Sequence, residues 1–360
     1  LAHPLREGGR PRVGAATLMD RFRHTSSASI DSLFRDVSDA ELCEVLRARR
    51  LCTVRDLVLV PDWEMRDWLL VSEEEAAAII ARACAYCAAP AVTAWDLACK
   101  RRPGVPTPLP SLDEAVGGSL SGLFVEIAGP GGVGKTQFCL HLAALTAAAG
   151  GEVLWIDTEG TFLPQRIQTL LQMSRGVGRN VDRSEGVEVA LRRICRRSCS
   201  SLQELLTVAQ ELEACAGRAE PLPALVVIDS IAAVARNEGD ASRASSGAQM
   251  VRRQASLSAL AASLKFIVNG VSGLSGPGVI VTNQVAGDMR GGSRVALGNV
   301  WFHAVNWRLV LSDPGGPRGM TPAASSNGQR HLLVDKSPCC RRLAIPFTVS
   351  AEGICEMAKE

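Results

Sequence analysis

The sequence lacks three features that would place it at once in a common class of protein. No run of about eighteen apolar residues occurs, so no segment is a candidate for a membrane-spanning helix. The net charge is only +2, so any binding of nucleic acid would depend on local basic patches and not on a basic chain. No second C-x-x-C pair accompanies Cys84 and Cys87, so a zinc site is not predicted.

The length of the chain and its cysteines indicate the number of domains and the cellular compartment. With 360 residues, 47% hydrophobic and 21% charged, the chain has room for one large globular domain and a small one, because single cores stop growing near roughly 250–300 residues. Twelve cysteines occur without a recognisable secretory leader. We therefore expect reduced thiols in a cytosolic or nuclear protein, with the C-x-x-C pair and the adjacent Cys339 and Cys340 as ordinary thiols.

One stretch fits the phosphate-binding pattern G-x-x-x-x-G-K-[ST] without a mismatch. Its glycines let backbone N–H groups turn inward around a polyphosphate, Lys135 supplies a point charge for the β- and γ-phosphates, and the Thr136 hydroxyl can bind Mg²⁺. The expected nucleotide-binding residues are Gly129, Pro130, Gly131, Gly132, Val133, Gly134, Lys135, Thr136 and Gln137.

The residues on either side support this interpretation. Residues 123–128 form a short apolar run typical of a strand, and residues 137–149 are rich in helix formers. Strand, glycine loop and helix in that order put the phosphates at a helix N-terminus. The alternative is a glycine-rich turn that carries a lysine by chance.

Beyond Ser111, short apolar runs alternate with helical patterns, which predicts an α/β fold with a mostly parallel sheet covered on both faces. Runs at 152–156, 225–228 and 279–281 are typical of buried parallel strands. Ser-Leu-Gln-Glu at 201–204 predicts a helix start with a capping box, and residues 249–264 predict another helix. Residues 268–276 and 313–329 are expected to form surface loops.

The residues before this region fall into three parts. Residues 1–35 mix glycine, proline, serine and arginine and are expected to be a disordered leader; an organelle transit peptide and a true start at Met19 are the alternatives. Residues 36–90 carry a helical pattern and predict a small N-terminal helical domain. The proline-rich residues 91–110 predict an extended linker, in which Trp95 either packs locally or anchors in a neighbouring subunit.

Three polar residues at the ends of apolar runs complete a candidate site for ATP hydrolysis. Asp229 ends the run at 225–228, where it can hold Mg²⁺ together with Thr136. Glu159 follows the run at 152–156 and can polarise the attacking water. Gln284 follows the run at 279–281, so its amide can sense the γ-phosphate. Glu159, Lys135 and Gln284 are therefore the predicted catalytic residues.

In their order along the chain these motifs resemble those of the RecA-type recombinases, in the eukaryotic RAD51 branch. The shared stretches are Gly-Lys-Thr-Gln at 134–137, Asp-Thr-Glu-Gly-Thr-Phe at 157–162, Val-Ile-Asp-Ser at 227–230 and Thr-Asn-Gln-Val at 282–285. The resemblance covers residues 36–355. It implies a RecA-like P-loop ATPase core over residues 111–360 with ATP and Mg²⁺ as cofactors. For residues 36–90 it implies either a helix-hairpin-helix variant that touches DNA or a plain packing domain.

Within the branch, residues 296–309 and Lys336-Ser337-Pro338 are most similar to the B group of paralogues. The strand-exchange recombinase has Asp-Ser-Pro at the latter position, where it caps the nucleotide of a neighbouring subunit. The resemblance therefore puts Lys336 where such a cap would face the neighbour. It also implies that His303 couples Gln284 to a DNA-binding loop.

Two loops face single-stranded DNA in filaments of this family. The resemblance places the first near residues 237–247, with Arg236 and Arg243, and the second near residues 286–297, with Arg290 and Arg294. Arginine would contact phosphates there; the alternative is solvated surface arginines. Neither loop contains an aromatic residue, so base stacking is not expected.

We therefore expect a nuclear, ATP-dependent, DNA-binding mediator of homologous recombination that acts in a paralogue complex during double-strand-break repair. Its ATPase is expected to be slow. The expected partners are single-stranded DNA and other paralogues, first the C type and then the D and X-two types, with no membrane. The alternative is a strand-exchange recombinase that forms its own filament, which the intact Glu159 supports, whereas Lys336-Ser337-Pro338 supports the mediator. A P-loop ATPase of the clock or helicase type would not explain the N-terminal helical domain.

Overall fold

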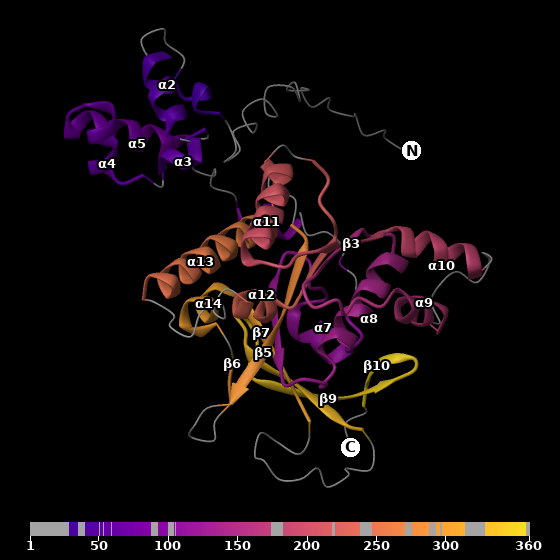
Figure 1. Cartoon of the computed structure of the whole chain (residues 1–360). Coiled ribbons are helices and arrows are strands. Elements are labelled where there is room, and N and C mark those ends of the chain that lie inside the picture. Colours follow the sequence, from indigo (N-terminus) through magenta and orange to yellow (C-terminus); the bar gives the residue numbers. More distant parts are fainter. Residues whose placement is uncertain are drawn as a thin grey trace, which may run out of the picture. The chain divides into compact units, whose positions relative to one another are not determined.

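The structure is a computed structural model (Figure 1). It describes residues 29–34, 40–49, 51–52, 54–58, 60–87, 93–99, 104, 106–173, 183–217, 220–237, 247–270, 276–287, 293–295, 297–313 and 328–357. Contacts divide the chain into two compact units, the first made of residues 1–93 and 217–220 and the second of residues 94–216 and 221–360. Within the described part of the chain, no helix is long and apolar enough to cross a membrane.

The first unit is helical, as the sequence predicts. Its elements are η1 (Ile30–Ser32), α2 (Ala40–Ala48), α3 (Val54–Val58), α4 (Asp62–Leu69) and α5 (Glu73–Cys87). At the start of α5, the Ser72 hydroxyl accepts from the Glu75 N–H while the Glu75 carboxylate accepts from the Ser72 N–H at 2.9 Å, which is a complete capping box.

The core of this unit begins earlier than the sequence indicates. Ile30, Leu33 and Phe34 are buried together with Leu46 and Met65. These first three residues therefore belong to the helical unit and not to a disordered leader ending at residue 35. Three apolar positions in a serine- and arginine-rich stretch are too few to show a helical period, and their role depends on packing against α2 and α4.

The second unit is built on a ten-stranded sheet. Its strands are β1 (Phe124–Gly129), β2 (Val153–Asp157), β3 (Ile194–Ser198), β4 (Leu225–Asp229), β5 (Gly278–Gly287), β6 (Ser293–Val295), β7 (Trp307–Ser312), β8 (Arg330–Lys336), β9 (Leu343–Ser350) and β10 (Gly353–Glu356). The order is β10-β9-β8-β7-β1-β5-β4-β2-β3, with β6 paired to β5. In the order of the sheet, the neighbouring strands β7, β1, β5, β4, β2 and β3 are parallel to one another. The pairs β7–β8, β8–β9 and β9–β10 are antiparallel, as is the pair β5–β6. The predicted α/β fold with a mostly parallel sheet is therefore confirmed.

Helices cover both faces of this sheet (Figure 1). The helices of this unit are α6 (Ala94–Cys99), α7 (Pro110–Val116), α8 (Lys135–Ala148), α9 (Pro164–Met173), α10 (Arg183–Arg192), α11 (Leu202–Gly217), α12 (Ile231–Asn237), α13 (Gly247–Asn269) and α14 (Gly298–Ala304). The described residues at the start of α6 are exposed, so this helix is not counted among those that cover the sheet. Because side chains alternate along a strand, Val125 and Ile127 of β1 join the core on the α8 side, whereas Phe124 joins the core under α11 to α14.

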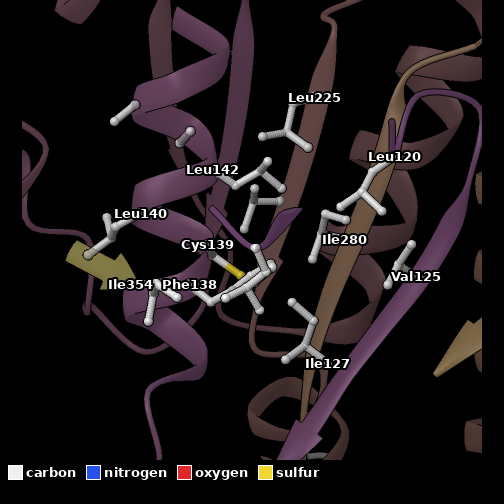
Figure 2. Packing of buried hydrophobic residues seen from close by; sticks show 14 of the residues in the cluster. Leu120, Val125, Ile127, Phe138, Cys139, Leu140, Leu142, Leu225, Ile280 and Ile354 are labelled. Carbon is white, nitrogen blue, oxygen red and sulfur yellow. The ribbon is translucent and has the colours of Figure 1, made fainter. Parts of the chain in front are cut away.

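Helix α8 is buried nearly all round because α9, α10 and β10 pack against it in addition to the central strands of the sheet. Figure 2 shows Phe138, Cys139 and Leu142 packed toward Ile127 and Ile280, and Leu140 on the other side of the helix. Each large apolar side chain buried in this way contributes roughly 1.5–3 kcal/mol of transfer free energy. Packing therefore fixes α8 against the sheet, and with it the first turn that carries Lys135 and Thr136.

Several elements differ in extent from the sequence prediction. Helix α13 continues to Asn269, so residues 268–269 belong to it and not to a loop, and residues 271–275 lie outside the described part. The predicted linker contains the short helix α6. At α11 the Ser201 hydroxyl caps Glu204 N–H, but the Glu204 carboxylate accepts from Ser200 N–H, one residue farther than in a capping box. Most of the predicted loop at 313–329 lies outside the described residues.

A buried histidine joins α8 to the last strand. His141 Nδ1 accepts from the Ile354 N–H at 3.1 Å, so the ring is neutral with Nδ1 unprotonated. Burial, together with the smaller effect of the nearby positive charge of Arg166, lowers the pKa of His141 to about 4. An unfolded histidine has a pKa near 6.5, so the unfolded chain binds more protons between these two values.

This pKa difference predicts an acid-sensitive fold. The contribution of neutral His141 is fully present above about pH 6.5 and is lost as the pH falls toward 4, so unfolding at pH 5 should cost about 2 kcal/mol less than at pH 7.5. Urea unfolding at the two pH values measures this. His141→Gln keeps an acceptor for Ile354 N–H but does not titrate, so its stability should change much less over this range. An equal pH dependence in both proteins would contradict the assignment.

Candidate nucleotide-binding site

The site lies at one edge of the sheet because four neighbouring parallel strands end there. Strands β1, β5, β4 and β2 are adjacent and parallel. Gly129 of β1 is opposite Gln284 of β5, and Asp157 of β2 is opposite Asp229 of β4. Carboxyl ends of parallel strands meet at one edge, so residues that are far apart in the sequence converge here, as predicted.

The glycine loop between β1 and α8 has the shape of an anion cradle. Gly132 and Gly134 have φ values of +78° and +108°, which residues with a side chain rarely adopt. A Cβ on Gly131 or Gly132 would meet nothing within 4 Å, so the loop faces open space, whereas one on Gly129 would lie 2.6 Å from Leu311 O. Open space above inward-turned backbone at a helix N-terminus fits a polyphosphate.

Lys135 is poised at this loop. Its Nζ donates to Gly129 O at 2.8 Å and to Pro130 O at 2.7 Å. Burial lowers the pKa of Lys135, while the negative charges of Asp229 and Glu159 act in the opposite direction. A partly buried ammonium that is held only by two carbonyl dipoles can exchange these for a full negative charge.

Asp229 collects three hydroxyl groups around one carboxylate. It accepts from Thr282 at 2.5 Å, from Thr136 at 2.8 Å and from Thr161 at 3.1 Å. Burial raises the pKa of Asp229, and the hydrogen bonds from these threonines oppose the rise. Among the described residues no group of three or more His, Cys, Asp or Glu could hold a metal by itself. Hard oxygen donors on Thr136 and Asp229 nevertheless fit Mg²⁺, which takes one or two protein ligands together with phosphates and waters.

Glu159 is fixed by the residue after Asp229. Its Oε1 accepts from Ser230 Oγ at 2.5 Å, and Ser230 is held in turn by the Thr158 hydroxyl, which accepts from Ser230 N–H at 2.7 Å. The Glu159 side chain is about one-third exposed, so it can reach a water molecule while its rotamer is restrained. Sequence reasoning missed Ser230, although its position directly after Asp229, the predicted metal ligand, is a signal that could have identified it.

Asp157 shapes the turn that carries Glu159. Its carboxylate accepts from Gly160 N–H at 2.8 Å and from the Arg196 Nε at 2.8 Å. Burial alone would raise the pKa of Asp157, but the hydrogen bonds from Arg196 and the turn backbone lower it overall. Sequence reasoning did not assign a role to either residue.

Gln284 contacts a residue from the end of a helix. Its Oε1 accepts a hydrogen bond from Arg236 Nη1, at the last turn of α12. The second terminal nitrogen of Arg236 lies 4.0 Å from Glu159 Oε1. Two of the three predicted catalytic residues, Gln284 and Glu159, are thus connected through an arginine that the sequence resemblance assigns to DNA binding.

Gln137, the last of the predicted nucleotide-binding residues, has a partner within the chain. Its Oε1 accepts from Arg166 Nε at 2.9 Å, and Arg166 also donates to Ser350 O and Ala351 O at the β9–β10 turn. Arg166 therefore ties the first turn of α8 to α9 and to the C-terminal hairpin.

A buried charge lies beneath Gln284. Glu126 in the middle of β1 is fully buried and accepts from Asn283 Nδ2 at 2.6 Å, Trp301 Nε1 at 3.1 Å and Arg308 Nε at 2.5 Å. The Asn283 Oδ1 accepts from Gln284 N–H at 2.8 Å. This cluster joins the sensor strand β5 to α14 and β7.

Lys336, in the segment that resembles a nucleotide cap, is bonded within its own chain. Its Nζ donates to Phe302 O at 2.8 Å and Val305 O at 2.7 Å, at the C-terminal end of α14, and lies 4.9 Å from the centre of the Phe302 ring. A cation at the carboxyl end of a helix satisfies carbonyl groups that have no partner within the helix. Burial lowers the pKa of Lys336, as do the positive charges of Arg308 and Lys265.

The predicted DNA-binding arginines are only partly described. Arg243 and Arg290 lie outside the described residues. Arg294 lies in β6, where its backbone pairs with Ala286 of β5. Their contact with DNA stays a prediction. Among the four arginines only Arg236 has a described side chain, and it faces the nucleotide site.

Comparisons with known proteins agree with this geometry. A family described as an AAA domain matches residues 100–272. The human DNA repair protein RAD51 homolog 2 is 28% identical over 355 residues, covering 87% of this chain and 86% of that protein. RAD51 homolog B of Zea mays is 30% identical over 262 residues, covering 68% and 67%. The chain belongs to the RAD51 family of DNA repair proteins. RAD51 homolog 2 of Arabidopsis thaliana is likewise 28% identical, covering 87% of each chain. The predicted resemblance to this family, and to its B group, is therefore confirmed.

Proposed function

We propose that the chain is an ATP-binding mediator of homologous recombination that acts in the nucleus, in complex with other RAD51-type paralogues, on single-stranded DNA. Family membership supports a role in DNA repair. The assembled loop, Lys135, Thr136 and Asp229 support binding of ATP with Mg²⁺. The C type of paralogue, followed by the D and X-two types, remains the proposed partner.

The residues of the site have separate roles in this proposal. Lys135 and the loop N–H groups bind the phosphates, and Thr136 and Asp229 hold the metal ion, which would neutralise charge on the β- and γ-phosphates. Glu159, restrained by Ser230, orients the attacking water and draws its proton. Gln284, in the second half of β5, senses the γ-phosphate. Slow hydrolysis of ATP is part of the proposal.

Lys336 is the observation that favours a mediator over a filament-forming recombinase. In assemblies of this family the nucleotide lies between subunits, so a filament of identical chains needs a cap that suits its own nucleotide site. Lys336 occupies the position of an acidic cap residue and donates to two carbonyls of its own α14. It is thus engaged inside its own chain, which supports pairing with a different paralogue.

Assembly with and without a partner tests the proposal. With ATP, Mg²⁺ and single-stranded DNA, the chain alone should give no regular filaments in electron micrographs, whereas addition of a C-type paralogue should give a discrete complex by size-exclusion chromatography with light scattering. A strand-exchange recombinase examined in parallel shows that the conditions permit filaments. Regular filaments of this chain alone that perform strand exchange would establish the recombinase instead.

A further inference from the structure

Arg236 connects two residues that come from different strands of the nucleotide site. It occupies the last turn of α12 (Ile231–Asn237), the helix that follows Asp229 and Ser230. One terminal nitrogen of its guanidinium donates to Gln284 Oε1, and the other lies 4.0 Å from Glu159 Oε1. The segment that directly follows α12 is the first of the two expected DNA-facing loops.

The contact with Gln284 determines which end of its amide is available. A glutamine amide has an accepting oxygen and a donating NH₂ group, whereas a guanidinium can only donate. With the oxygen held by Arg236, the NH₂ group remains free to donate to an anion. The reversed amide would place the NH₂ group against the guanidinium, donor against donor, so Arg236 selects one orientation.

The contact with Glu159 is the weaker of the two. The side chains of Arg236 and Glu159 are about half and one-third exposed, and 4.0 Å is at the limit of an ion pair. Exposed pairs of this kind contribute little because water and salt screen them. The larger effect of Arg236 is therefore expected through Gln284.

We propose that Arg236 is a positioning residue of the nucleotide site, which orients the Gln284 amide so that its NH₂ group donates to the γ-phosphate. This rests on the proposed function, because it requires the site to bind ATP. It also reassigns Arg236, which the sequence resemblance placed among the DNA contacts. The preference for a triphosphate over a diphosphate then depends on a residue in the last turn of α12.

Binding of two nucleotides separates this role from a structural one. Titration calorimetry with Mg²⁺ and either ATPγS or ADP is measured for wild type, Arg236→Met, Arg236→Lys and Gln284→Ala. Loss of one hydrogen bond to a charged phosphate should weaken ATPγS binding about tenfold in Arg236→Met and Gln284→Ala. Binding of ADP, which has no γ-phosphate, should be unchanged. Arg236→Lys keeps a donor for Gln284 Oε1 and should recover part of the preference.

A double variant and a control complete the experiment. Arg236→Met combined with Gln284→Ala should bind ATPγS no more weakly than Gln284→Ala alone, because both changes remove the same interaction. Arg192→Met, which removes an exposed arginine paired with Glu188 on α10, should leave both affinities unchanged. Arg236→Met should also leave the salt dependence of single-stranded DNA binding unchanged.

Several results would overturn the assignment of Arg236. Equal losses for ATPγS and ADP would mean a general structural effect, and additive losses in the double variant would mean that Arg236 and Gln284 act independently. Unchanged binding of ATPγS would mean that Arg236 does not position Gln284. A salt slope reduced by about 0.7, the value for one phosphate contact on a single strand, would return Arg236 to the DNA contacts. A wild-type chain that binds neither nucleotide would instead overturn the proposed function, and this inference with it.

Discussion

Replacing Lys135 with alanine should weaken ATP binding by about a hundredfold. The ammonium places a full positive charge at the glycine loop, where it donates to two carbonyl oxygens at 2.7–2.8 Å that it can exchange for a phosphate. A charged hydrogen bond is worth about 1.5–3 kcal/mol, and the remaining backbone N–H groups are dipoles without a full charge. Titration calorimetry with ATPγS measures the loss. Lys265→Ala on α13 removes a lysine outside the site and should leave the affinity unchanged.

Replacing Glu159 with glutamine should reduce ATP hydrolysis and leave ATP binding nearly unchanged. The amide oxygen can still accept from Ser230 Oγ, so the local structure and ATP affinity should be retained. The group that draws the proton from water is lost, and general bases contribute about 10²- to 10⁴-fold, so hydrolysis should fall at least a hundredfold. Single-turnover measurements are needed because the wild-type rate is expected to be low. If both variants lost affinity equally, the role given to Glu159 would be wrong.

The parts of this site that the sequence predicts are those with a fixed position relative to a strand. Gly129 and Asp229 each end a strand, and parallel strands bring their carboxyl ends together. Gln284 follows an apolar run as predicted, but it does not close the strand, because β5 continues to Gly287. A local pattern therefore gave a correct long-range arrangement. Lys135 and Thr136 are predictable for the same reason, because the glycine loop fixes where α8 begins.

The parts that the sequence does not predict depend on which side chains meet across elements. Arg236 lies in the last turn of α12, and nothing in the neighbouring sequence indicates that it reaches Gln284, 48 positions away. In the sequence, Glu126 interrupts an apolar run, and the sequence alone does not show whether its side chain is exposed or is buried with a partner. Only the packing of α14 and β7 against β1 shows its partners, Trp301 and Arg308. The same holds for Lys336, whose contacts come from the end of α14.

Breaking the buried pair of Glu126 and Arg308 should cause the largest loss of stability. Both side chains are more than nine-tenths buried, and Arg308 Nε lies 2.5 Å from Glu126 Oε2. Arg308→Met leaves a buried carboxylate that only two neutral donors, Asn283 and Trp301, still satisfy. Loss of one partner of a buried pair costs about 3–5 kcal/mol, because the remaining charge is not compensated. Urea unfolding followed by tryptophan fluorescence measures this, since Trp301 and Trp307 are both buried and Trp301 donates to Glu126.

A matched exposed pair and a double variant distinguish buried charge from loss of packing. Arg342→Met removes the partner of Asp335 at the surface and should cost less than about 1 kcal/mol. Glu126→Gln combined with Arg308→Met removes both charges, while the amide oxygen can still accept from Asn283 and Trp301 through the position of Oε1. The double variant should therefore lose less stability than the sum of the single variants, by more than about 1 kcal/mol. If the losses were additive, or if Arg308→Met cost no more than Arg342→Met, the pair would act through packing alone, and the link from β5 to α14 would not depend on its charges.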